Sequence, residues 1–367
     1  MGKLIPNAFN LLVVIYVALG STACSYGMAI IGSTIGQPSF YTSLGLAPPD
    51  EEGYARTAGF IGGFNGVNCA GSAIGCLLCT YCADKYSRKR TIQGAAVVLC
   101  MGAALCAGSV NNAMFLVGRI INGLGIGALV AAIPMYQAEV STPESRGFMV
   151  SMHGVMFAMG YTLSAWLGFG MYFITAGGST SSFPWRFPML PFSPRWLLMQ
   201  DRHEEAHDVL MKLHRDKTDP HDVVARKEFY QMKKQVEMDR LIKQSTSKFE
   251  LFKTPANRRR ALVGFVLMWN NQFTGVLIIA NYGVILYGAL GMDGYMPLLL
   301  TSLWVTSTFP GNIFCAFFVE KFGRRTFLLI GLTGILVALI CETALQAQFL
   351  GTNNKAGQNA AIFFIFL

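Results

Sequence analysis

Charged residues are scarce in this chain. They make up 13% of its 367 residues, whereas soluble proteins carry about 25%. With 53% hydrophobic residues and a mean hydropathy of +0.42, the chain cannot cover a globule of this size with polar side chains. This shortage excludes an ordinary cytosolic enzyme, a disordered protein and a small disulfide-stabilised scaffold. The apolar composition and the 39 glycines instead predict an all-α polytopic membrane protein that is not an enzyme.

The chain also lacks an evenly spread basic surface. Its net charge is +9, but residues 195–260 hold 16 of the 29 lysines and arginines and 11 of the 20 acidic residues. Short basic loops between apolar spans are typical of membrane topology and not of a DNA-binding surface. We therefore expect a lipid bilayer as a partner, no nucleic acid and no cofactor. The nine cysteines all lie in apolar stretches, which implies no disulfide framework.

The apolar stretches are long enough to cross a bilayer, which takes about 20 helical residues. The first of them resembles a signal peptide, but its apolar run continues to Ile35, so we expect it to be retained as a helix. We predict eight spans, near 10–35, 58–82, 92–111, 113–136, 148–175, 261–290, 296–319 and 326–349, and a stub at Ala360 to Leu367.

Counting the spans reveals a gap. Basic residues mark inside loops, so with the N-terminus inside, the fifth span ends outside near Ala176. The next span follows Arg258-Arg259-Arg260, which should be inside. The stretch 183–199 between them contains four prolines and cannot form a membrane helix. Because an odd number of crossings is needed between these two points, we predict that one helix is missing here and that residues 191–260 are a cytosolic helical linker.

The linker contains His203-Glu204-Glu205-Ala206-His207, which matches the zinc-protease pattern H-E-x-x-H. The match lies in a charged segment with the pattern of a water-exposed helix, so we interpret it as a solvated helix face with no metal.

Acidic and basic residues recur together at the inside ends of the spans. They either anchor the helices at the headgroups or form salt bridges that close one gate of a transporter. Arg119 lies within a span, where an unpaired charge is costly. The candidate gating residues are Asp84, Arg88, Arg119, Glu139, Arg146, Glu320, Arg324 and Arg325.

The span at 261–290 carries amides, which are expensive in an apolar helix unless they meet polar partners. Amide groups offer paired donors and acceptors that match neighbouring sugar hydroxyls. We therefore expect a polar solute site made of Asn271, Gln272, Asn281 and Tyr282.

Five motifs in order resemble the sugar-porter family of the major facilitator superfamily, and most closely its fungal hexose transporter-like members. The loop from Asp84 to Arg90 resembles D-x-x-G-R-R/K, and the stretch from Gly118-Arg119 through Glu139 to Arg146 resembles the long signature of the fourth span. The other three motifs are Pro191 to Leu197, similar to P-E-S-P-R-W-L, Asn271 to Gly275, similar to Q-Q-x-T-G, and Val319 to Arg325, similar to V-E-x-x-G-R-R.

The resemblance implies twelve helices in two six-helix halves, with a sugar site at the midplane and alternating access. It divides the chain into an N-terminal half at 1–190, the linker at 191–260 and a C-terminal half at 261–367. On this pattern helix six is absent, and the chain ends at the start of helix ten. A gene-model error, splicing or a pseudogene would each produce these gaps. We expect the chain as written to take up no sugar, and a form with these helices restored to do so.

Several positions depart from the family pattern. Gly27 stands where proton-coupled members carry Asp near the fourth-helix Arg, Gly154 and Leu277 replace two sugar-site amides, and Ser87 replaces the loop Gly. The loss of a titratable carboxylate favours uniport, with proton symport left open through another carboxylate.

The resemblance implies transport of a monosaccharide or related polyol across the plasma membrane. The alternative is a membrane sugar sensor or a non-functional remnant of a transporter.

Overall fold

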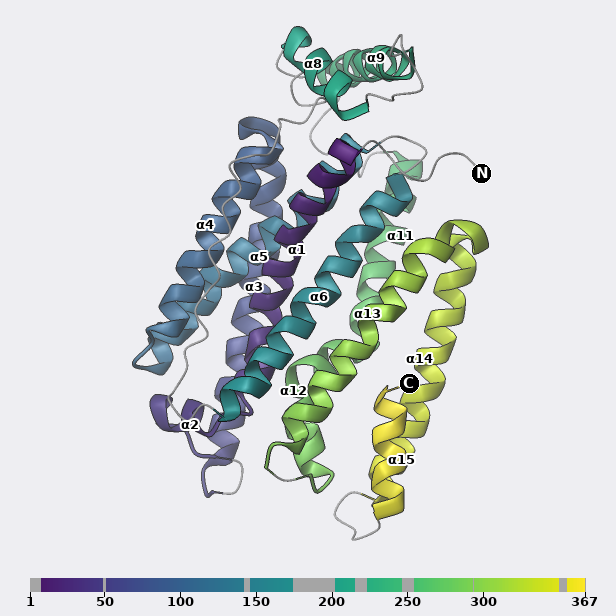
Figure 1. Cartoon of the computed structure of the whole chain (residues 1–367). Coiled ribbons are helices and arrows are strands. Elements are labelled where there is room, and N and C mark those ends of the chain that lie inside the picture. Colours follow the sequence, from purple (N-terminus) through teal and green to yellow (C-terminus); the bar gives the residue numbers. More distant parts are fainter. Residues whose placement is uncertain are drawn as a thin grey trace.

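The computed structural model describes residues 8–48, 51–141, 146–173, 202–214, 223–245, 254–292, 294–349 and 355–366. In this part of the chain every regular element is a helix and no strand occurs, which confirms the predicted all-α class. The long helices run side by side, and two further helices lie across one end of the bundle (Figure 1).

The N-terminal half contains one short helix and several long ones. The short helix α2 begins with a proline, whose fixed φ suits the first turn of a helix, and ends at Gly45 in the left-handed region (φ 63°). The elements are α1 (Ala8–Thr34), α2 (Pro38–Leu44), α3 (Tyr54–Tyr86), α4 (Arg88–Ala107), α5 (Asn112–Val140) and α6 (Arg146–Phe173).

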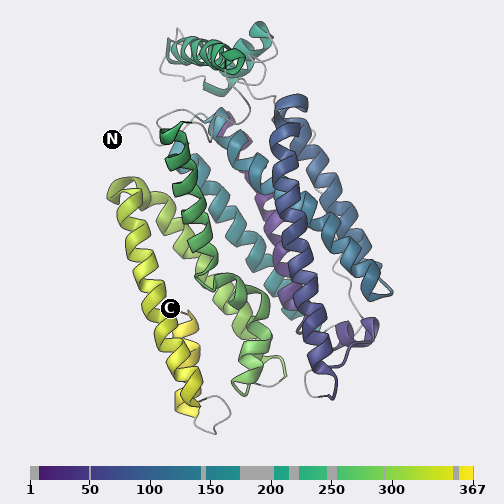
Figure 2. The same cartoon turned by 180° about the vertical axis from the view of Figure 1, so that it is seen from behind.

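The rest of the chain forms a pair of polar helices and then a second group of apolar helices, seen from behind in Figure 2. In the polar pair, Ala206 and Val236 are buried against each other with Phe229 and Met232 around them. The elements are α8 (His203–His214), α9 (Val223–Ser245), α11 (Pro255–Gln272), α12 (Val276–Ala289), α13 (Met296–Phe322), α14 (Arg324–Phe349) and α15 (Lys355–Phe366).

Six of the described helices are long and apolar enough to cross a membrane, and they coincide with predicted spans. The other two predicted spans coincide with α6 and with α11 and α12. The stretch at 261–290, predicted as one helix, is two helices, because residues 273–275 interrupt it. Gly275 adopts a φ of 73° there, a conformation that glycine reaches without steric cost.

Glycines set the distance between α3 and α5. Gly71 and Gly75 on α3 lie against the backbone of Ile120 and Leu124 on α5. Gly123 and Gly127 on α5 lie in turn against the backbone of α3. A methyl group at any of these four glycines would overlap a carbonyl oxygen of the facing helix, so the G-x-x-x-G step is a backbone-to-backbone contact.

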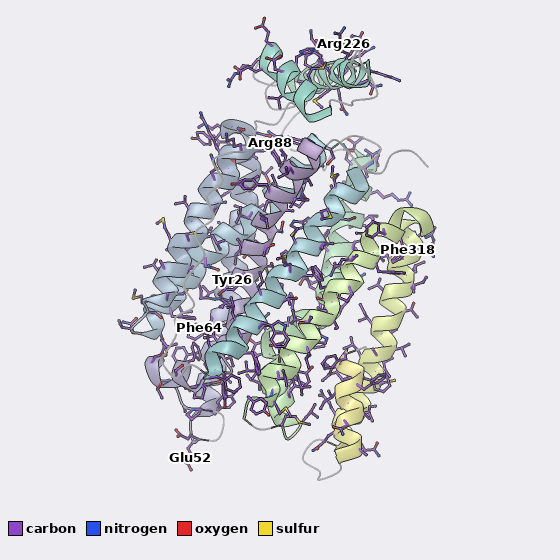
Figure 3. All side chains as sticks on the ribbon, viewed as in Figure 1. Tyr26, Glu52, Phe64, Arg88, Arg226 and Phe318 are labelled. Carbon is purple, nitrogen blue, oxygen red and sulfur yellow. The ribbon has the colours of Figure 1, made fainter. Side chains whose placement is uncertain are left out.

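The two ends of the bundle differ. We call the end at which α8 and α9 lie the linker end, and the opposite end, at which α2 lies, the α2 end. Figure 3 shows Arg88 near the linker end, with Arg226 beyond it on α9, and Glu52 at the α2 end. Partly buried Val209 of α8 packs on the core that includes Val13 of α1, which connects the linker to the N-terminal half.

The helix α6 ends at the α2 end of the bundle, and α8 lies at the opposite end (Figure 1). The predicted absence of helix six falls on residues 174–201, outside the described residues.

Candidate solute site and gates

The two halves touch each other toward the α2 end. Trp166 Nε1 on α6 donates a hydrogen bond to Thr306 Oγ1 on α13 (2.9 Å), and Ser302 Oγ on α13 donates to the backbone oxygen of Ala165 (3.1 Å). The start of α13 also approaches the end of α1, where a methyl group at Gly36 would lie 2.8 Å from Leu298 Cδ2. The halves are therefore in van der Waals contact across this end of the bundle.

A pocket lies where four helices from the two halves meet. Its walls are mainly apolar, with hydroxyl groups from each half among them. The lining residues are Ala29, Gly32 and Ser33 of α1, Tyr161 and Ala165 of α6, Ala280 of α12, and Leu298, Thr301, Ser302 and Val305 of α13.

The structure places the predicted solute residues beside this pocket rather than in its wall. Asn281 and Tyr282 follow the lining residue Ala280 on α12, and the backbone of Asn281 lies 3.6 Å from a methyl group built on Gly32. The Asn281 amide donates to the backbone oxygen of Leu277 in its own helix (3.0 Å). Gln272 is exposed on α11, and the side chain of Asn271 is outside the described residues.

Sequence reasoning missed the polar partner of Tyr282. Asn65 Nδ2 on α3 donates a hydrogen bond to the hydroxyl oxygen of Tyr282 (3.1 Å). This bond joins the two halves through side chains. Asn65 could have been found from the sequence, because an amide in the apolar second span is costly unless it meets a polar partner.

At the linker end of the N-terminal half, Arg88 of α4 contacts both α3 and α5. Arg88 pairs with Asp84 (3.1 Å) and Glu139 (3.1 Å), and it donates to the backbone oxygen of Ala83 (3.0 Å). Two of the predicted charge clusters therefore meet in one network of α3, α4 and α5. Arg88 is thus a described partner of Glu139, and the pairing of Glu139 with Arg324 and Arg325 of the other half stays a prediction.

The remaining predicted gating residues form no pair that the structure describes. Arg325 is exposed and has no ion pair among the described residues. The side chains of Arg146, Glu320 and Arg324 lie outside that part of the structure.

Arg119 is buried, and none of the described carboxylates lies beside it. Its side chain is 2% exposed, and Nη1 donates a long hydrogen bond to the backbone oxygen of Gly27 (3.5 Å). The Nε and Nη2 atoms reach no hydrogen-bond partner among the described residues. This arrangement matches the expectation that Gly27 leaves the arginine without its usual acidic partner.

A second contact that sequence reasoning missed joins α1 and α6. Ser21 Oγ lies 2.6 Å from His153 Nδ1, and the imidazole ring packs against Phe157. His153 precedes Gly154, a position that the resemblance implied for sugar binding. A titratable ring that was not predicted therefore lies between two spans.

Comparison with known proteins agrees with this architecture. The family model described as "Sugar (and other) transporter" matches residues 13–367. The chain belongs to this sugar transporter family. An Aspergillus cristatus protein named MFS-type transporter criB is 29% identical over 93% of this chain and 74% of its own length.

Other members of the sugar transporter family are also similar. The sugar transporter STL1 of Saccharomyces cerevisiae is 29% identical over 81% of this chain and 54% of its own length. The MFS glucose transporter mfs1 of Aspergillus flavus is 30% identical over 77% of this chain and 57% of its own length. The chain thus spans little more than half the length of these two relatives.

Solved structures show the same fold. A structure of the proton:xylose symporter XylE, bound to 6-bromo-6-deoxy-D-glucose, has a TM-score of 0.78 and 22% identity, covering 98% of this chain and 79% of that chain. An inward-open structure of XylE from E. coli has a TM-score of 0.67 at 20% identity, covering 97% and 79%. The predicted major facilitator fold is confirmed. The chain is an integral, multi-pass membrane protein of a transporter family and not an enzyme.

Proposed function

We propose that this chain, in a form that has helix six and the helices after the start of helix ten restored, moves a monosaccharide or related polyol across the plasma membrane by alternating access, as a uniporter or a proton symporter. The contact between the halves at the α2 end carries the proposal. There α1 meets α12 and α6 meets α13, on both sides of the pocket. Relatives named for glucose and for proton-coupled myo-inositol transport support this substrate class.

In this proposal the α2 end is the outer gate, which is closed here, and the linker end faces the cytosol. Residues 1–190 and 261–367 are the two transmembrane halves, and residues 191–260 are the cytosolic linker between them. Solute binding belongs to Asn271, Gln272, Asn281 and Tyr282. Gating at the linker end belongs to Asp84, Arg88, Glu139, Arg146, Glu320, Arg324 and Arg325, with Arg119 inside the bundle.

The bond between Asn65 and Tyr282 gives the proposal a mechanical element. Tyr282 would bind solute from α12, while its hydroxyl is held by α3 of the other half at 3.1 Å. A solute hydroxyl that competes for the Tyr282 oxygen or the Asn65 amide would weaken this link between the halves. Binding would then favour opening of the outer gate.

The test is uptake of labelled hexoses and polyols by transporter-null cells. We compare the 367-residue chain with a chimaera that adds helix six, the rest of helix ten and helices eleven and twelve of the Aspergillus cristatus relative, inserting helix six between residues 188 and 191. We expect saturable, competitor-sensitive uptake by the chimaera and none by the 367-residue chain. Saturable uptake by the 367-residue chain would contradict the missing-helix interpretation, and no uptake by either would contradict transport.

The same assay tests the solute residues. We expect Tyr282→Phe and Asn65→Leu each to raise the KM of the chimaera about tenfold, because each leaves one polar partner unpaired. Thr333→Ala is the matched control, since Thr333 is exposed on α14 and its hydroxyl bonds only within its own helix. An unchanged KM in both site variants would place the solute elsewhere.

A further inference from the structure

An acidic side chain is buried inside the second group of apolar helices. Glu342 lies on α14, within a stretch apolar enough to cross a membrane, and it is 7% exposed. Charged groups are rare in such positions and mark functional sites when they occur. Glu342 was not among the residues singled out in the sequence.

The polar groups around Glu342 come from two helices. Gln346, one turn further along α14, donates its amide to Glu342 Oε1 (3.0 Å). Tyr287 of α12 interacts electrostatically with Glu342 and is 1% exposed. The Tyr287 hydroxyl has no hydrogen-bond partner among the described residues. A buried hydroxyl without a partner is costly, so this hydroxyl is free to bond to a group that the site brings to it.

The surroundings of this pair are apolar. Tyr287 packs in a cluster with Leu290 of α12 and with Ala361 and Ile365 of α15, and Leu345 of α14 packs against the same cluster. An ionised carboxylate in such a place loses its hydration without gaining a counter-charge.

No described lysine, arginine or histidine forms an ion pair with Glu342. The other titratable or charged groups on the surrounding helices are Tyr282 on α12, Cys315 on α13, and Arg325 and Cys341 on α14. The side chains of Glu320, Lys321, Arg324 and Lys355, and Asp293 between α12 and α13, lie outside the described residues. Arg325 is separated from Glu342 by more than four helical turns of α14.

We propose that Glu342 is the proton-binding site of the C-terminal half. In the arrangement seen here the carboxyl group is neutral and accepts the amide of Gln346. When the site opens to water, the O–H bond of the carboxyl group breaks, the proton passes to water, and the carboxylate accepts a hydrogen bond from Tyr287. Uptake of a proton from water on the other side reverses the step, and no other reactant is consumed.

This site would couple a proton to solute movement, and that part rests on the proposed transport function. Tyr287 lies on the same helix as Asn281 and Tyr282, five residues beyond the latter. Formation of the proposed bond between Glu342 and Tyr287 would therefore act on the helix that bears the solute residues and touches α1. The carboxylate missing at Gly27 in the N-terminal half would thus have a counterpart in the C-terminal half.

The proton site itself is tested without transport. We compare infrared difference spectra of the 367-residue chain in lipid nanodiscs between neutral and alkaline pH. The wild type should lose a protonated-carboxyl band at alkaline pH, Glu342→Gln should lack this band, and Glu342→Asp should restore one. Glu139→Gln is the matched control and should keep the band, since Glu139 is paired with Arg88. An unchanged band in Glu342→Gln would overturn the proposal.

The coupling is tested by solute uptake and proton flux in the chimaera defined above. Glu342→Gln should abolish solute-induced proton flux and flatten the pH dependence of uptake, whereas Tyr287→Phe should lower the flux several-fold. Wild-type flux in Glu342→Gln, with flux lost in His153→Gln, would place the proton on the imidazole and overturn the coupling. Absence of any uptake by the wild-type chimaera would refute the transport function, and the infrared result would still decide the proton site.

Discussion

The two halves make the same turn at the linker end with different residues. Between α3 and α4 the turn residue is Ser87, with a φ of 89°, and between α13 and α14 it is Gly323, with a φ of 84°. Both turns follow an acidic residue and precede an arginine. Ser87 is the one described residue other than glycine with a positive φ, so the N-terminal half keeps the turn despite its steric cost. The geometry of the turn is therefore specified by the packing of the helices and not by the local residue alone.

The halves also differ in how closely their helices approach. In the N-terminal half, Gly71, Gly75, Gly123 and Gly127 each face a carbonyl oxygen of the neighbouring helix. In the C-terminal half, Gly264, Gly311, Gly331 and Gly334 have nothing within 4 Å of an added methyl group. The first four glycines are therefore contacts between helices, and the second four are surface positions.

The largest effect should come from adding one methyl group in each half. Gly127→Ala would push the methyl group into the backbone oxygen of Ser72, at a cost of roughly 1–3 kcal/mol. Gly331→Ala meets nothing and should stabilise α14 by about 0.5–1 kcal/mol, because alanine loses less conformational freedom in a helix. Thermal unfolding of both variants in detergent checks the prediction. Equal melting temperatures would show that the α3–α5 contact is not tight.

The two buried arginines of the N-terminal half should respond in opposite ways. Arg88→Gln removes the partner of Glu139, and we expect it to lower the free energy of unfolding by about 1–3 kcal/mol. Arg119→Gln removes a buried charge without a carboxylate and should leave that free energy unchanged or raised. Chemical unfolding in mixed micelles measures both. A loss in Arg119→Gln as large as that in Arg88→Gln would reveal a partner for Arg119.

We expect Glu139, which is paired with Arg88, to affect transport as well. In the chimaera, Glu139→Gln should lower the uptake rate several-fold at unchanged surface expression, because it weakens the network around Arg88. Glu205→Gln is the control, since Glu205 pairs with Arg202 on an exposed surface of α8, where ion pairs contribute little. Unchanged uptake in Glu139→Gln would remove its role in the gate.

Exchanging the residues at the two turns tests whether a side chain at position 87 is strained. Ser87→Gly should raise stability by about 1 kcal/mol, and Gly323→Ser should lower it by a similar amount, because a side chain is strained at positive φ. Ser141→Gly is the control, since Ser141 ends α5 with a φ of −80° and gains no relief from glycine. If Ser87→Gly were no more stable than Ser141→Gly, the turn would carry no strain.

The smallest effect is expected from single cysteines that report which side of the membrane each end of the bundle faces. A cysteine at Arg259, at the start of α11, should not react with an impermeant thiol reagent added outside intact cells. A cysteine at Thr42, which is exposed on α2, should react in the same experiment. Ready labelling at position 259 would place the linker outside and contradict the assignment of the two ends.

The positions of the helices could be predicted from the sequence better than the side-chain contacts between them. Long apolar runs fix helices such as α5 and α14 to within a few residues, because a bilayer leaves the backbone no other way to satisfy its hydrogen bonds. The interruption at Gly275 was not foreseen, since the stretch remains apolar on both sides. The pairing of Arg88 with Glu139 depends on α4 folding back beside α5, which no local pattern encodes. Asn65, His153 and Glu342 were missed because each lies within an apolar span and belongs to none of the five motifs.

The contact between the halves at the α2 end is the closed outer gate of the proposed transport cycle, and a reversible cross-link shows whether it must open. Gly36→Cys and Leu298→Cys would bring two thiols within reach, since a β-carbon at position 36 lies 3.0 Å from Leu298 Cγ. We predict that the oxidised double variant of the chimaera takes up no sugar, that reduction restores uptake, and that each single variant is insensitive to oxidation. Unimpaired uptake with the cross-link complete would contradict a gate that must open at this end.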